Sequence, residues 1–246
     1  MKKLLSLGLA SITLALSTAA MAYPTQLGAT GGAILPDANI AQVGACELAT
    51  DFYDTNLDSP VIVRALTGLT PNLEVGAGYN FQNDANAWTV GAKYLTPVTL
   101  ADFKWALGGA YMDTSDPLMK KVTTAYLVGT RPLTAGDATT PAITGSLGLM
   151  WTEYELQPFF GSFSDSAIRP FFAAQAQFGS GLLLSAEYQL KDSAVDTKAL
   201  SSIAARYPFT KTVTGQVGYS NGMFGAIGGD DYSVFFGANI TFDCPR

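Results

Sequence analysis

The chain contains no histidine among its 246 residues. Histidine is the usual base beside a catalytic serine or cysteine, and it is the commonest metal ligand. Its absence removes most hydrolase chemistry and most zinc sites. We therefore expect a protein that is not an enzyme and that needs neither a cofactor nor a metal.

Charged side chains are also scarce, at 14% of the chain, against roughly 25% in an average soluble domain. The mean hydropathy is +0.20. After residue 22, however, no apolar run approaches the ~18 residues that a transmembrane helix needs. If the mature protein lies in a membrane, it does not cross with helices.

Residues 1–22 have the features of a secretory signal peptide. Lys2 and Lys3 precede an apolar run, and residues 20–22 (AMA) have the small-x-small form of a cleavage site. A lone transmembrane anchor is the alternative, but the run is short and no basic flank follows. Cleavage removes two of the 14 basic side chains and leaves 12 against 20 acidic ones, a net charge of −8. That balance argues against a nucleic-acid partner.

The dominant pattern after the signal peptide is an alternation with period two. In residues 73–81, for example, Leu73, Val75 and Tyr79 fall on one face, whereas Glu74 and Asn80 fall on the other. Such alternation predicts a strand with one apolar and one polar face. The sequence contains twelve such segments, at 45–54, 60–70, 72–82, 87–96, 101–112, 121–131, 142–154, 169–178, 181–191, 200–208, 212–221 and 231–242.

These segments fit either a soluble β-sandwich or a membrane barrel. Four features favour the barrel. The segments have the 9–11 or so residues with which a tilted strand crosses a bilayer. The polar faces are rich in small residues, and aromatic residues gather near strand ends. Short connections also alternate with mostly longer polar ones, as in outer-membrane barrels. We predict an all-β, antiparallel up-and-down transmembrane barrel over residues 45–242, with 243–246 as a periplasmic tail.

The last predicted strand carries a more specific signal. It alternates apolar residues and ends on "GANITF", and in this it resembles the C-terminal assembly signal of bacterial outer-membrane β-barrels of the porin-like class; the residues concerned are Tyr232, Phe236, Ile240 and Phe242. Four residues follow Phe242, which departs from that pattern. The resemblance implies a bacterial outer-membrane location, contact with lipid and lipopolysaccharide, and recognition by the barrel-assembly machinery.

Residues 28–44 (GATGGAILPDANIAQVG) resemble the N-terminal stretch of YjbH-like barrel proteins linked to exopolysaccharide export. The matching positions are Gly28, Thr30, Gly31, Pro36, Ala38 and Gly44. Three arrangements of the segment 23–44 are open: it lies in the lumen as a plug, it lies in the periplasm, or part of it forms strands. The last arrangement would raise the strand count from twelve to fourteen.

Isolated charges on the polar faces are the candidate functional residues. We predict that nine of them face the lumen, namely Glu47, Arg64, Glu74, Lys93, Lys104, Arg131, Glu187, Lys191 and Arg206. They either filter small solutes or pair across the lumen and fill it. The first possibility predicts a passive, porin-like channel for small hydrophilic solutes. The second predicts a non-conducting structural barrel or a component of envelope or exopolysaccharide assembly.

The chain has only two cysteines, Cys46 and Cys244. They lie at the start of the first predicted strand and just after the last one. A closed barrel sets these two strands side by side, and the periplasm is oxidising. We therefore predict a Cys46–Cys244 disulfide at the seam, with two independent free thiols as the alternative.

Overall fold

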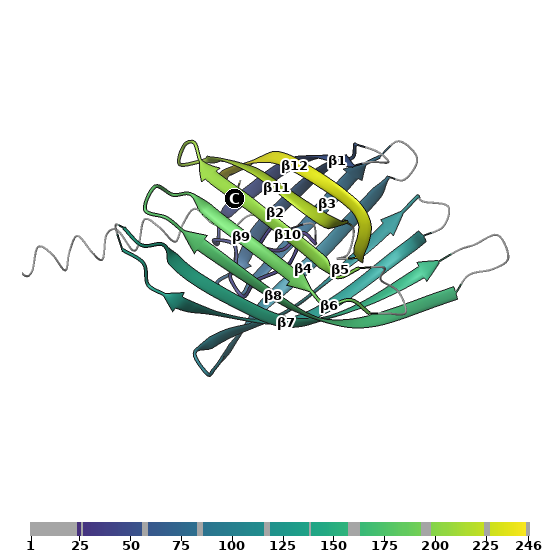
Figure 1. Ribbon diagram of the computed structural model, residues 1–246, viewed down its shortest axis with the longest axis horizontal. Helices are drawn as coiled ribbons and strands as arrows, with labels where there is room; N and C mark the ends of the chain where they lie inside the picture. Colours follow the sequence, from purple (N-terminus) through teal and green to yellow (C-terminus); the bar gives the residue numbers. More distant parts are fainter. Residues whose placement is uncertain are drawn as a thin grey trace, which may run out of the picture.

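A computed structural model describes residues 24–25, 27–55, 59–82, 86–115, 119–137, 139–156, 163–192, 198–223 and 227–244. The predicted signal peptide lies outside these ranges. Twelve antiparallel strands form one closed barrel (Figure 1). They are β1 (Ala45–Thr55), β2 (Val61–Thr70), β3 (Leu73–Phe81), β4 (Ala87–Leu100), β5 (Phe103–Thr114), β6 (Met119–Thr134), β7 (Ala142–Leu156), β8 (Phe163–Gln177), β9 (Leu183–Gln189), β10 (Leu200–Pro208), β11 (Val213–Met223) and β12 (Ile227–Asp243).

Each strand pairs with its neighbours in the sequence, and β12 pairs with β1 to close the barrel. The closing register is continuous, from Ala45 opposite Asp243 to Thr55 opposite Ser233. Every strand therefore has a hydrogen-bonded neighbour on both sides, as a barrel in hydrocarbon requires. The prediction of a twelve-stranded up-and-down barrel is confirmed.

Alternation along the strands separates an apolar outer face from the interior. In β9, Leu183 and Gln189 are buried, while Leu184 and Tyr188 between them are exposed. The same holds around the barrel, where the exposed side chains include Ile168, Phe172 and other large apolar residues. A soluble sheet would bury these side chains, so the outer surface is suited to lipid. Among the described residues, no helix is long and apolar enough to span a membrane.

The connections at one end of the barrel are short. Pro71 and Asn72 join β2 to β3, and Ala101 and Asp102 join β4 to β5. The latter two have φ angles of 53° and 64°, in the left-handed region that a tight hairpin turn uses. β1 begins and β12 ends at this same end of the barrel, as the antiparallel pairing requires.

The strands extend beyond the predicted segments where the sequence is polar. β8 begins at Phe163 instead of at 169, and β12 begins at Ile227 instead of at 231. Residues 163–168 pair without interruption with residues 151–156 of β7. Apolar alternation reports only the part of a strand that faces lipid, whereas backbone pairing continues into the aqueous region. The predicted connection between the segments 142–154 and 169–178 was therefore too long.

Most described residues from Pro24 to Ala41 are buried inside the barrel, residues 42–44 are exposed, and none of them forms a strand (Figure 1). Its isolated bridges are Pro24–Thr30 and Gly31–Pro36, within the segment, and Val43–Gly68, where it meets β2. The twelve strands close without it. The fourteen-strand alternative is therefore wrong for the part of the chain that the structure describes.

A hydrophobic core lies between this segment and the wall. Leu27, Ile34 and Leu35 of the segment are buried in one cluster with inward-facing wall residues that include Phe171 and Phe235. Ile34 and Leu35 are fully buried. The barrel thus has an apolar outer face toward lipid and a second, internal apolar core that the N-terminal segment completes.

The two cysteines form a disulfide, as predicted. Cys46 and Cys244 lie on neighbouring strand ends, with their Cα atoms 5.1 Å apart. The backbone N–H of Cys244 also donates to the carbonyl of Gly44 at 2.9 Å. This bond and the disulfide hold the chain end against the start of β1.

Candidate functional site: the lumen of the barrel

Six of the nine charges that were predicted to face the lumen are buried inside the barrel. They come from six different strands and reach the interior because each lies on the inward face of its strand. These residues are Glu47, Arg64, Glu74, Lys93, Glu187 and Arg206.

Two further predicted charges, Lys104 and Lys191, are exposed. Lys104 shares a strand face with the buried Ala106 and Ala110, but it lies one residue from the start of β5, at the rim. Lys191 follows the last residue of β9. Both therefore belong to the openings of the barrel instead of its interior.

The prediction for Arg131 was wrong. Its neighbour Thr130 is buried and bonds to Ser146 within the barrel at 2.7 Å, so Arg131 takes the outer face. Its guanidinium lies 5.0 Å from the centre of the Phe103 ring, an outward-facing aromatic. Arginine can extend from the edge of the apolar surface to the aqueous phase, so a cation is tolerated there.

Sequence reasoning missed three buried charges, Asp37, Asp51 and Arg169. Asp51 lies four residues after Glu47 in β1 and therefore on the same inward face, so alternation alone could have identified it. Arg169 is the first residue of the predicted segment 169–178, whereas β8 begins six residues earlier, at Phe163. The predicted segment therefore contained no residues before Arg169 that would show which face its side chain takes. Its guanidinium lies 5.6 Å from the centre of the Tyr154 ring. No strand pattern signals Asp37, which lies in the N-terminal segment.

Glu187 on β9 and Arg206 on β10 hold the turn at residues 31–35, and we call this pair the β9–β10 clamp. The Glu187 carboxylate accepts the backbone N–H of Ile34 at 3.0 Å and that of Leu35 at 3.1 Å. Arg206 donates to the carbonyl oxygens of Gly31 and Gly32. One acid and one base therefore satisfy both the donors and the acceptors of the same turn.

Glu74 on β3 and Lys93 on β4 form a second pair, the β3–β4 clamp. They are directly opposite in the strand register, with Lys93 Nζ 2.9 Å from Glu74 Oε1. Glu74 accepts the N–H groups of Thr30 at 2.8 Å and Ala41 at 2.7 Å. Lys93 donates to the carbonyls of Thr30 at 2.9 Å and Asp37 at 3.0 Å. This clamp therefore joins Thr30 to Asp37 and Ala41, which lie later in the segment.

A chain of polar contacts links the seam to the β9–β10 clamp. Arg64 forms an ion pair with Asp51. Gln216 donates to Asp51 at 2.6 Å and accepts from Arg206 Nε at 3.1 Å. Buried charges need such partners, because an unpaired ion in a low-dielectric interior is strongly destabilising. The interior charges therefore bind one another and the segment.

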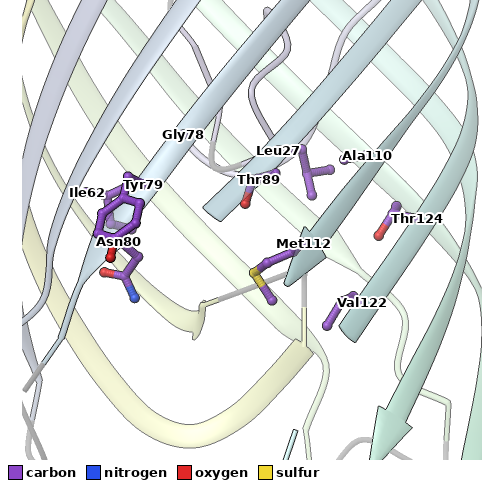
Figure 2. A pocket seen from close by; sticks show the side chains of 10 residues that line it. All are labelled: Leu27, Ile62, Gly78, Tyr79, Asn80, Thr89, Ala110, Met112, Val122 and Thr124. Atoms are coloured by element: carbon purple, nitrogen blue, oxygen red, sulfur yellow. The ribbon is translucent and has the colours of Figure 1, made fainter. Parts of the chain in front are cut away.

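A small cavity remains beside the segment (Figure 2). Leu27 lines it on the side of the segment, and the remaining lining residues belong to β2–β6. The lining comprises Leu27, Ile62, Gly78, Tyr79, Asn80, Thr89, Ala110, Met112, Val122 and Thr124. Within the described ranges, no three histidine, cysteine, aspartate or glutamate residues are grouped so as to hold a metal ion.

Comparison with known proteins identifies the fold. No family model matches the chain, and no curated protein matches its sequence. Among solved structures, the KdgM porin is similar with a TM-score of 0.59 and 12% identity, over 80% of this chain and 99% of that one. One KdgM structure is a complex with disordered oligogalacturonate.

Two further outer-membrane proteins share the architecture. The NanC porin has a TM-score of 0.55 at 14% identity, over 79% of this chain and 98% of that one. Omp33 of Acinetobacter baumannii has a TM-score of 0.50 at 8% identity, over 82% and 100%. At such identities the likeness establishes a shared barrel fold and carries nothing about the solute.

Proposed function

We propose that this protein is an outer-membrane channel for small hydrophilic solutes in a Gram-negative-type bacterium. The observation that carries the proposal is the reversal of polarity across the wall. The outer face is apolar, whereas the inner face holds paired charges, amides and hydroxyl groups. A closed barrel with this distribution lowers the cost of moving a polar solute across hydrocarbon.

The outer surface is suited to the partners that the resemblance implies. Phe236, Ile240 and Phe242 of β12 are all exposed on the outer face, where lipid and the barrel-assembly machinery would contact them. The side chain of Tyr232, the fourth predicted signal residue, lies outside the described part of the chain. We further propose contact with lipopolysaccharide at the end that carries the longer connections, and we expect no enzymatic activity.

The second candidate is a non-conducting structural barrel, or a component of envelope or exopolysaccharide assembly. The burial of Ile34 and Leu35 in one cluster with Phe171 and Phe235 favours it, because these side chains occupy space inside the barrel that a solute would need. The resemblance of residues 28–44 to YjbH-like proteins points the same way and stays a prediction.

Single-channel recording in planar bilayers separates the two functions. The purified full-length protein is inserted and recorded, beside the variant Gly76→Ala, whose new methyl group would overlap the carbonyl of Gly28 in the segment. We expect few openings from the native barrel and frequent, steady openings from the variant. Silence of both proteins, with insertion verified by protease protection, would contradict the channel.

A further inference from the structure

We propose that the lumen wall is a binding site for peptide backbone, and that residues 24–41 are its removable occupant. Only one consequence of this proposal rests on the proposed channel function, namely that departure of residues 24–41, which we call the plug, opens the pore. The site itself is defined by the two clamps and by wall glycines on β3 and β4, beside the β3–β4 clamp.

The chemistry of the clamps is directed at the main chain. Glu187 and Arg206 contact four backbone groups of the turn at 31–35. Glu74 and Lys93 also contact backbone N–H and C=O groups of the segment. Charged partners make strong hydrogen bonds with peptide groups. The wall thus recognises a backbone conformation, and the ligand class is a glycine-containing peptide that makes a tight turn.

Wall glycines let the peptide approach closely. A Cβ atom at Gly76 would overlap the carbonyl of Gly28, and one at Gly91 would lie 2.8 Å from the carbonyl of Leu27. Within the segment, a Cβ at Gly32 would overlap the Glu187 carboxylate. Backbone thus packs on backbone, with no side chain between them on these strands.

The segment is separable from the barrel that holds it. The twelve strands close without it, and among the described residues the isolated bridge that joins it to the wall is the one between Val43 and Gly68, at its end. Residues 42–44, which connect it to β1, are exposed. A ligand held by side-chain clamps and apolar contacts can leave while the backbone pairing of the wall stays intact.

The test keeps the full chain and cuts it after assembly. A protease site is inserted after Gln42, in the exposed stretch 42–44. Once the barrel has folded in detergent, cleavage leaves the plug bound only by non-covalent contacts. Release of the free peptide is then followed by size-exclusion chromatography and mass spectrometry, without any measurement of conductance.

The clamps predict the rate of release. We expect the double variant Glu187→Gln, Arg206→Gln to release the peptide at least tenfold faster than the native barrel. Lys104→Gln, on the inward face of β5 but exposed at the rim, is the matched charge control and should release it at the native rate. Added synthetic peptide 24–41 should rebind to the native barrel, and the same peptide with Gly32→Val should not.

A second pair of variants keeps the test decisive if the charge variants do not assemble. Gly76→Ala should speed release, whereas Gly78→Ala on the same face of β3, with Arg64 Cγ 3.3 Å away as its nearest contact, should not. Release only on boiling, or equal rates in all variants, would overturn the proposal. If the peptide leaves and the emptied barrel is silent in a bilayer, the channel function is wrong while the peptide site stands.

Discussion

Arg131 and Lys104 carry the same charge at the same end of the barrel, yet they face opposite sides of the wall. Lys104 pairs in register with Thr130, which is buried, so the residue after Thr130 faces outward. In β6 both faces are largely apolar, with Val128 inside and Leu127 outside. The hydrophobic pattern therefore does not show which face of β6 points into the barrel. The charge of Arg131 alone predicted the wrong face.

Asp137, in the turn between β6 and β7, offers a test at the scale of one residue. The backbone N–H and the hydroxyl group of Thr139, together with the N–H of Thr140, stabilise its carboxylate and lower its pKa to about 2. A lowered pKa in the folded state means that the stabilisation is complete above the ordinary value near 3.9 and disappears as the pH falls through about 2.

We expect NMR of the carboxyl carbon in micelles to give a titration midpoint near 2. Thr139→Ala removes the hydroxyl donor, which lies 2.8 Å from Asp137 Oδ1, and should move the midpoint upward. A native midpoint near 4, unchanged in this variant, would show that the turn bonds are not formed in solution.

At the scale of the element, β1 and β12 form the seam, and the disulfide fixes their ends. The cysteines are separated by 198 positions. Chain-entropy arguments give about 5 kcal/mol for a loop of that length, as an upper value. We expect the double variant Cys46→Ser, Cys244→Ser to unfold at a lower denaturant concentration than the oxidised native protein.

The matched control for the seam is the native protein under reducing conditions, which should unfold together with the double variant. Thr67 lies 3.3 Å from Cys244 Sγ and is left unchanged in both. Equal unfolding midpoints for the oxidised and the reduced protein would show that the disulfide adds no stability.

The strands themselves were largely predictable, because each element contains its own signal. Alternation in residues 73–81 gives β3 directly, and the position of the cysteines gives the seam. The polar start of β8 at Phe163 could not be found in this way, because its pairing with Leu156 depends on a neighbouring strand and not on its own pattern.

At the scale of the whole molecule, an outer-membrane barrel should withstand detergent that unfolds soluble sheets. Its backbone hydrogen bonds are closed around the ring, so no edge offers a place to begin unfolding. We expect the unheated protein to migrate differently from the boiled protein on SDS gels, and membranes to release it only with detergent. Release by alkaline washing, with no shift on the gel, would favour a soluble sandwich.

The interior was less predictable than the wall. Alternation identified Glu74, Lys93, Glu187 and Arg206 as inward-facing, but it could not say what they bind. Their partners in the N-terminal segment are backbone groups more than 30 positions away in every case, as the contact between Glu187 and Ile34 illustrates. Backbone groups are the same in every residue, so the sequence carries no signal of such contacts.

The bond between Cys46 and Cys244 has a topological consequence. The polypeptide from residue 46 to residue 244 is a covalent circle, from which residues 24–45 extend as a tail. A single break in any loop between the strands turns the circle into a line but separates nothing. A single break in the tail, by contrast, detaches everything before it. Proteolytic damage to the loops therefore leaves the molecule in one piece, and the occupant of the lumen is the part that one cut can separate.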